Sequence, residues 1–211
     1  MRSRRFGSWT RTTGKTTYYK RRGLSGRGVM MLVGVAVILI SGGFLLSDLR
    51  LLGGSLPAPE DESLRLTVPK MQRVKNVPVY TAAANDTAKL DAGAIHLKDT
   101  GDPWESGANV YIAGHRLGYP QTGSFLLFYD LDKLQNGDKV LLRDTEGRRY
   151  VYQVFKEFVV EPSNFSVTKP VAGKSIVSLQ ACTLPDYSKR LIVQAELIDV
   201  QEPQAPQASV D

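Results

Sequence analysis

Cysteine and histidine are the scarcest chemically reactive residues of this 211-residue chain, which contains only Cys182, His96 and His115. A single cysteine excludes an internal disulfide. The Cys and His spacing of a zinc site is missing, as are the carboxylate spacing of an EF-hand loop and the glycine pattern of a phosphate-binding loop. The sequence therefore predicts no metal ion and no cofactor, and cysteine or histidine chemistry has few candidate residues.

Acidic residues are absent from positions 1–27, which carry nine basic ones, and residues 28–47 carry no charge at all. The rest of the chain holds 18 basic and 21 acidic residues. The formal charge of +6 therefore belongs to the N-terminal tail, whereas the remainder is formally −3. This distribution argues against nucleic-acid binding by the folded part.

The uncharged run at 28–47 has the length of a transmembrane helix. Its twenty residues span roughly 30 Å of helix, which is about the thickness of a bilayer core. Because the basic flank precedes the run, residues 1–27 are expected in the cytoplasm and the rest outside. A cleaved signal peptide is the alternative, with Ser41, Gly42 and Gly43 as cleavage site, but its apolar region is about 7–15 residues long. The sequence predicts a single-pass protein of the cell membrane.

The remaining chain divides into a stalk, one domain and a tail. Residues 48–66 are rich in Gly, Pro, Ser and acids and predict an extracellular stalk, while 201–211 predict a disordered tail. Residues 67–200 suffice for one domain with its own core. Their apolar runs are short and β-branched, which predicts an all-β, closed or nearly closed barrel with short helical turns near 129–134 and 162–165. The predicted strands are 77–80, 94–97, 109–114, 139–144, 149–160, 175–181 and 191–200.

Local patterns add detail to this barrel. Tyr150, Tyr152 and Val154 alternate with Val151, Gln153 and Phe155, which indicates one inward and one outward face of their strand. Glu146 and Gly147 lie between this strand and the preceding one. A hairpin turn is predicted there.

Three residues at strand ends point to nucleophilic chemistry. Cys182 ends a predicted strand, and the seven-residue loop TLPDYSK leads to Arg190, which begins the next strand, while His115 follows another strand end. A thiolate is the attacking form of cysteine, and a neighbouring imidazolium or guanidinium favours it. The imidazolium can protonate a leaving amine, and the guanidinium can stabilise an oxyanion. These roles need no acidic partner if the imidazole is charged. The alternative is an inert buried cysteine with a structural His115 and Arg190.

Several segments resemble the sortase family of cysteine transpeptidases, over about residues 66–200. GANVYIAGHRLGYPQTGSF is similar to the segment with the family's catalytic histidine, and SLQACTLPDYSKRLIVQAEL is similar to its strand–Cys–loop–Arg–strand signature. The resemblance implies an eight-stranded barrel behind the transmembrane helix. It also implies Cys182 as nucleophile, His115 as general acid and base, and Arg190 as the group that stabilises the oxyanion or positions the substrate. The substrate is expected to lie against Ala181, Thr183, Tyr119 and Tyr187.

The resemblance implies a two-step reaction on secreted proteins with a C-terminal sorting signal of the LPxTG or LAxTG kind. The cysteine forms a thioester at the Thr–Gly bond, and an amine of a peptidoglycan precursor or a pilin lysine resolves it. The similarity is closest to the housekeeping class E of Gram-positive actinobacteria. A pilin-polymerising sortase, a hydrolytic cysteine peptidase and a non-catalytic anchored barrel that binds a wall component or partner are the alternatives.

The sequence departs from the family at two places. Where the family commonly has Thr-Leu-x-Thr-Cys, this chain has Ser178 and Ala181, so the preferred signal is not predicted. Residues 102–104, Asp-Pro-Trp, resemble the lid tripeptide of pilus-building sortases, but they lie about a dozen residues before His115. They are expected to form a loop turn, and no lid is predicted. His96 is expected to have a supporting or structural role.

Overall fold

A computed structural model of the chain describes residues 54–203. The predicted cytoplasmic tail, the uncharged run at 28–47 and most of the predicted C-terminal tail lie outside the described residues. Within 54–203, none of the helices has the length and apolar character needed to cross a bilayer.

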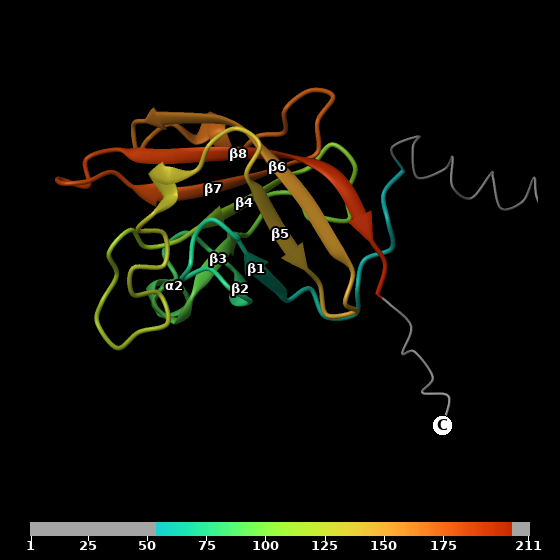
Figure 1. The fold of residues 1–211 in the computed structure, drawn as a ribbon, viewed down its shortest axis with the longest axis horizontal. Coiled ribbons are helices and arrows are strands. Elements are labelled where there is room, and N and C mark those ends of the chain that lie inside the picture. The colour runs from blue at the N-terminus through green and yellow to red at the C-terminus, as the bar shows by residue number, and fades with distance from the viewer. Residues whose placement is uncertain (1–53, 204–211) are drawn as a thin grey trace, which may run out of the picture. The chain divides into compact units, whose positions relative to one another are not determined.

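Eight strands close into a barrel in the order β1-β2-β3-β4-β7-β8-β6-β5 (Figure 1). The pairs β2–β3 and β4–β7 are parallel, and the other neighbours are antiparallel. The all-β closed barrel predicted from the sequence is thus confirmed. The strands are β1 (Leu64–Thr67), β2 (Val77–Ala82), β3 (Ala94–Leu97), β4 (Asn109–Ala113), β5 (Lys139–Arg143), β6 (Arg149–Val160), β7 (Ile176–Cys182) and β8 (Arg190–Gln201).

The helical elements of the described region are short. They are α2 (Thr87–Ala92) and the 3-10 helices η1 (Leu131–Lys133) and η2 (Phe165–Thr168). η1 falls within the predicted turn at 129–134, and η2 begins where the other predicted turn ends. α2 was not predicted: it has six residues, none of them buried, so it shows no apolar periodicity. Asp86 caps it by accepting a hydrogen bond from the backbone N–H of Lys89 at 3.1 Å.

Inward-facing side chains of the strands fill the barrel. In β6 the alternation predicted from the sequence is present, because Tyr150, Tyr152 and Val154 are all buried in the core. The predicted β5–β6 hairpin is also confirmed. Gly147 in its turn has φ of +88°, a conformation that glycine adopts at little cost.

The predicted stalk boundary is corrected by β1. Leu64 and Leu66, placed in the stalk by their acidic and Pro-rich surroundings, are buried in the barrel core. Ahead of β1, Leu56 packs against the same core and donates its backbone N–H to the carbonyl of Trp104 at 2.7 Å. The barrel therefore begins before residue 67. A strand of four residues with two leucines is too short to give a clear alternating signal.

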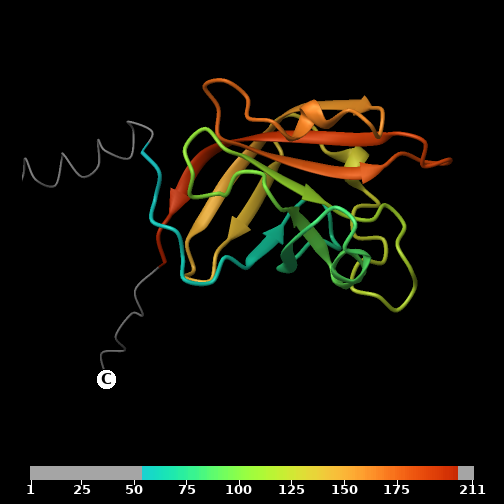
Figure 2. The same cartoon turned by 180° about the vertical axis from the view of Figure 1, so that it is seen from behind.

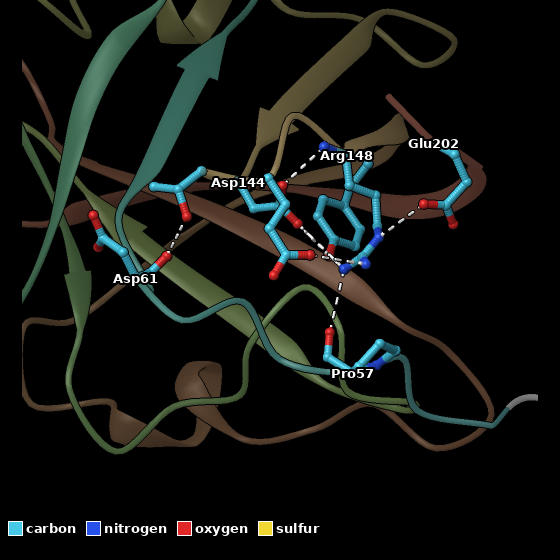
Figure 3. Close-up of polar contacts among 8 residues, drawn as sticks. Pro57, Asp61, Asp144, Arg148 and Glu202 are labelled. Carbon is cyan, nitrogen blue, oxygen red and sulfur yellow. Dashed lines mark hydrogen bonds and ion pairs between the residues drawn. The ribbon is translucent and has the colours of Figure 1, made fainter. Parts of the chain in front are cut away.

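Arg148 ties the two ends of the described chain to the β5–β6 turn (Figure 3). Its Nη1 donates to the carbonyl of Pro57 at 3.2 Å, to Asp144 at 3.3 Å and to the hydroxyl of Tyr150 at 3.2 Å. Its Nε donates to Glu202, beyond β8, at 3.4 Å. Figures 1 and 2 show this turn at the end of the barrel opposite the β7–β8 loop. We call it the chain-end pole, and the end with the β7–β8 loop the mouth.

Candidate active site

Cys182 and Arg190 lie directly opposite each other at the mouth, as the last residue of β7 and the first residue of β8. Their neighbours Ala181 and Leu191 are buried in the core. Because successive side chains of a strand point to opposite faces, Cys182 and Arg190 lie on the outer face of the barrel. Cys182 is a free thiol and is partly exposed.

The β7–β8 loop is closed by its own hydrogen bonds. The backbone N–H of Thr183 donates to the carbonyl of Lys189 at 3.0 Å, and the N–H of Lys189 donates to the hydroxyl of Thr183 at 3.1 Å. Nη1 of Arg190 donates to the carbonyls of Tyr187 and Lys189, each at 3.1 Å. The loop therefore holds one edge of the guanidinium at the base of the mouth.

His115 reaches the same place through the parallel pair β4–β7. Ala113 at the end of β4 pairs with Gln180, and the N–H of Gly114 donates to the carbonyl of Gln180 at 3.0 Å. His115 follows Ala113 by two positions, just past the end of β4, and Cys182 follows Gln180 by two positions at the end of β7. The strand register thus brings the segments with the imidazole, the thiol and the guanidinium to one end of the barrel.

A carboxylate that sequence reasoning missed contacts the imidazole. Oδ1 of Asp91 lies 3.0 Å from Nε2 of His115, and the two side chains are 34% and 27% exposed. Asp91 belongs to α2, and its carbonyl accepts a hydrogen bond from the N–H of Ser124 at 3.0 Å. The only signal in the sequence was an acid in a six-residue helix, 24 positions before His115. The contact engages Nε2, and Nδ1 has no hydrogen bond within residues 54–203.

The backbone around His115 is also braced. The carbonyl of His115 accepts a hydrogen bond from the N–H of Phe128 at 3.0 Å. Arg116 is buried and forms an ion pair with Asp132 at 2.6 Å. Its Nε has no hydrogen-bond partner within residues 54–203. These contacts join the strand end with His115 to the segment around η1.

Polar side chains follow the outer face of β4 and β7 toward Cys182. The hydroxyl of Tyr111 donates to Oε1 of Gln180 at 2.7 Å. Burial raises the pKa of Tyr111 above its usual range, although the positive charge of Arg190 acts in the opposite direction. Tyr111 is therefore a neutral hydrogen-bond donor. Ser178, at the position where the family has Thr, is buried and donates to Oδ1 of Asn109 at 2.8 Å.

The four residues expected at the substrate take different places. Ala181 is buried in the barrel core, so its side chain does not reach the surface where Cys182 lies, and the structure corrects this expectation. Alternation along β7 is the reason, because Ala181 precedes the outward-facing nucleophile candidate. The hydroxyl of Thr183 is engaged in closing the loop. Tyr119 and Tyr187 are 62% and 43% exposed, and the Tyr119 ring lies edge-on to His115 with 6.0 Å between ring centroids.

His96 lies apart from this arrangement, buried on β3. Its Nε2 contacts the carbonyl of Gly101 and the hydroxyl of Thr100, both at 3.1 Å. Burial lowers the pKa of His96, so its 3.7 Å contact with Asp102 is not a charged pair near neutral pH. Asp102 and Trp104 belong to the loop that was predicted to be a turn, and Trp104 is buried in the core.

Comparisons with known proteins place the chain in a family. Residues 66–198 match the family model of the sortase domain. Sortase A of Streptococcus agalactiae serotype III (strain NEM316) is 33% identical over 124 residues, which are 58% of this chain and 48% of that protein. Sortase A of Bacillus anthracis is 28% identical over 137 residues, 64% of this chain and 55% of that protein. The chain thus spans about half the length of these curated relatives.

Solved structures agree with this match. Sortase A from Corynebacterium diphtheriae is 27% identical with a TM-score of 0.57, and the similarity covers 68% of this chain and 63% of that one. Sortase C-3 from Streptococcus pneumoniae is 28% identical with a TM-score of 0.61, over 72% and 71% of the two chains. The family model alone matches more than half of the sequence. The chain therefore belongs to the sortase family.

Proposed function

We propose that the chain is a cysteine transpeptidase that cleaves a sorting signal and transfers the cleaved protein to an amine. One observation supports this proposal: the register sets Cys182 opposite Arg190, and His115 and Cys182 each follow the Ala113–Gln180 pair of β4 and β7 by two positions. A nucleophile, a proton carrier and a permanent cation at one accessible strand end are the groups that acyl transfer requires.

In the first step, the Cys182 thiolate attacks the carbonyl carbon of the scissile Thr–Gly bond. The guanidinium of Arg190, whose Nη1 is held by loop carbonyls, directs its remaining donors to the developing oxyanion. The imidazolium of His115 gives its proton to the departing amine as the C–N bond breaks. The products are a thioester on Cys182 and the released C-terminal fragment.

In the second step, an amine attacks the thioester. Neutral His115 accepts the proton of that amine, the C–S bond breaks, and Cys182 leaves as a thiolate. The proposed acceptor is an amine of a peptidoglycan precursor or a pilin lysine, and the proposed donors are secreted proteins with LPxTG-like or LAxTG-like signals. We also propose the class E housekeeping type.

Asp91 gives the imidazole its orientation. By holding Nε2 at 3.0 Å it fixes the ring and leaves Nδ1 for proton transfer at the mouth. A carboxylate beside the ring also stabilises the imidazolium that the first step uses. In this proposal Asp91 is a positioning residue, because it acts on the reaction only through His115.

The proposed location is the outer face of the cell membrane. The uncharged run at 28–47, with nine basic residues before it, supports a single transmembrane helix with its N-terminus in the cytoplasm. The barrel follows on the outer side, where both secreted proteins and wall precursors are present.

Incubation of the full chain with signal peptides and an amine acceptor tests the proposed function. We expect a thioester on Cys182 by mass spectrometry, followed by the ligated product. Cys182→Ala should abolish both, whereas Ser188→Ala, in the same loop, should change the rate less than about twofold. Cleavage that survives Cys182→Ala would refute the proposal. Hydrolysed product without any ligated product would instead identify a peptidase.

A further inference from the structure

Three arginines stand side by side on the outer face of the barrel near the chain-end pole. Arg65 on β1 pairs with Arg143 on β5, which in turn pairs with Arg149 on β6. All three are exposed. Like charges directly opposite each other on neighbouring strands destabilise a sheet. This arginine row therefore has a cost for folding, and a role in binding would explain its presence.

Three carboxylates at the chain-end pole already have a partner. Asp144, Glu146 and Glu202 each form an ion pair with the buried guanidinium of Arg148, at 3.3, 3.3 and 3.4 Å. These ion pairs are with Arg148 and not with the row, although Glu202 also lines a hollow beside the row. The positive charge of the arginine row faces the solvent, where it can attract an anion.

A hollow of about 600 Å³ lies between the β5–β6 turn and the end of β8. Two members of the row line it, and the lining residues are Arg143, Gly147, Arg149, Gln201, Glu202 and Pro203. Guanidinium groups present several N–H donors in a planar fork that matches a phosphate group. The hollow provides a concave site for a phosphate-bearing group beside the row.

The β1–β2 loop has exposed cations of its own, but it follows the end of β1 away from the β5–β6 turn, because Arg65 pairs with Arg143 and Thr67 with Leu141 farther along β5. Its exposed cations are Lys70, Arg73 and Lys75. Nη1 of Arg65 donates to the carbonyl of Asn76 in this loop at 3.3 Å, but the three loop cations lie apart from the chain-end pole and provide a matched control for the row.

This surface lies where the chain arrives from its N-terminal part. The carbonyl of Asp61 accepts a hydrogen bond from the hydroxyl of Thr145 at 2.6 Å, and that of Pro57 accepts one from Arg148, so residues 57–61 are held against the β5–β6 turn (Figure 3). Only residues 48–53 separate the described chain from the uncharged run. Six residues span at most about 20 Å. A role of the row in membrane binding rests on the transmembrane helix that we propose for 28–47.

We propose that the arginine row and its hollow bind the anionic phospholipid headgroups of the membrane in which the chain is anchored. Each basic side chain near such a surface contributes attraction, and several together hold the barrel by its chain-end pole. β8 alone measures about 35–40 Å at about 3.3 Å per residue, and Cys182 lies at its far end. Headgroup binding therefore directs the mouth away from the bilayer.

Lipid-dependent quenching of a single fluorophore tests this orientation. The full chain with Cys182→Ser has no other thiol, so Ser63→Cys labels the exposed segment directly before β1 at the chain-end pole, and Ser163→Cys labels the β6–β7 loop near the mouth. Each labelled chain is reconstituted in nanodiscs whose lipids carry a headgroup nitroxide, with or without phosphatidylglycerol. We expect phosphatidylglycerol to increase quenching at position 63 and not at position 163, and high salt to reverse the increase.

Matched pairs of substitutions make the test specific. Each lost arginine should lower the ratio of docked to undocked protein about fivefold, so Arg143→Gln with Arg149→Gln should lower it at least tenfold. Lys70→Gln with Lys75→Gln removes the same charge from the exposed β1–β2 loop, away from the chain-end pole, and should leave the ratio within about twofold. A melting curve checks folding, and Arg65→Gln alone is the second variant if the double one unfolds.

Three outcomes would overturn the proposal. They are equal quenching at position 63 with and without phosphatidylglycerol, an equal loss in the lysine pair, and selective displacement by inorganic phosphate at matched ionic strength, which would indicate a site for free phosphate. The experiment uses a chain without the nucleophile. Headgroup binding and the proposed transpeptidation can therefore fail independently of each other.

Discussion

The two ends of the barrel hold their charged side chains in opposite ways. At the chain-end pole, Arg148 is 6% exposed, and its Nε, Nη1 and Nη2 all donate to other groups. At the mouth, Cys182 and Arg190 are partly exposed, and only one edge of the guanidinium is held. A buried charge with a complete set of partners stabilises the fold. Side chains that keep exposed surface and free donors remain available for a substrate.

The two histidines repeat this contrast. His96 is 2% exposed, with both ring nitrogens in contact with neighbouring groups. His115 is 27% exposed, and one ring nitrogen contacts Asp91. Burial lowers the pKa of His96, because desolvation disfavours the charged ring. His96, in β3, therefore has a structural environment, whereas His115, beyond the end of β4, is exposed enough to take part in chemistry.

The largest expected effect is the loss of Arg148. Arg148→Met leaves Asp144, whose side chain is completely buried, without its cation, and should lower the free energy of unfolding by about 3–5 kcal/mol. Chemical denaturation measures the change. The exposed neighbour gives the control: Arg149→Met should stay within about 0.5 kcal/mol. Equal effects of the two changes would remove the distinction between the buried network and the surface row.

The mouth should show the opposite result, a loss of rate with little loss of stability. Arg190→Gln removes the permanent charge and should lower kcat/KM about 10²–10³-fold, as the loss of an oxyanion donor does. The free energy of unfolding should change by less than about 1 kcal/mol, since the side chain is partly exposed. Lys189→Gln is the matched control, because Lys189 pairs with exposed Glu161 at 3.1 Å. A similar loss of rate in both variants would deny Arg190 a specific role.

A smaller effect is expected from Asp91, which touches only the imidazole. Asp91→Asn should lower kcat about tenfold, part of the roughly 10²–10⁴-fold that general acid–base catalysis contributes, and change KM less than twofold. Asp91→Glu should restore part of the rate. Steady-state kinetics separates the two parameters, and Asp99→Asn, an exposed acid outside the site, is the control. A loss confined to KM would mean that Asp91 contacts substrate instead of positioning His115.

The sequence predicted the parts of the fold whose signal is local. The Glu146–Gly147 turn and the alternation of β6 were readable because turn residues and burial leave a pattern over a few positions. The opposition of Cys182 and Arg190 also followed, since two strands joined by a short loop usually pair. The catalytic roles assigned to these two residues stay predictions.

Other features could not be read because they depend on distant contacts. The partnership of Asp91 with His115 depends on where α2 packs, and a six-residue helix without a buried residue carries no such information. β1 is defined by its pairing with β2 and β5, which lie far along the chain. The inward position of Ala181 was implicit in the strand alternation, but the expectation that it meets the substrate followed the family resemblance instead.

The smallest effect concerns the loop beside His96, where a buried acid opposes the fold. Burial, with the nearby charges of Glu105 and Glu62, raises the pKa of Asp102 to about 6 from its ordinary 3.8. The folded chain therefore binds this proton more tightly than the unfolded one, and the stability it contributes, present below about pH 4, is lost as the pH rises through 6. Asp102→Asn removes that loss and should stabilise the protein by about 1–2 kcal/mol near pH 8. This gain is smaller than the pKa shift of Asp102 alone implies, because a quarter of its side chain is exposed and solvent screens the charge. Thermal melts across this pH range should show the gain fading toward pH 4, and a gain that does not change with pH would mean that packing, not ionisation, is responsible.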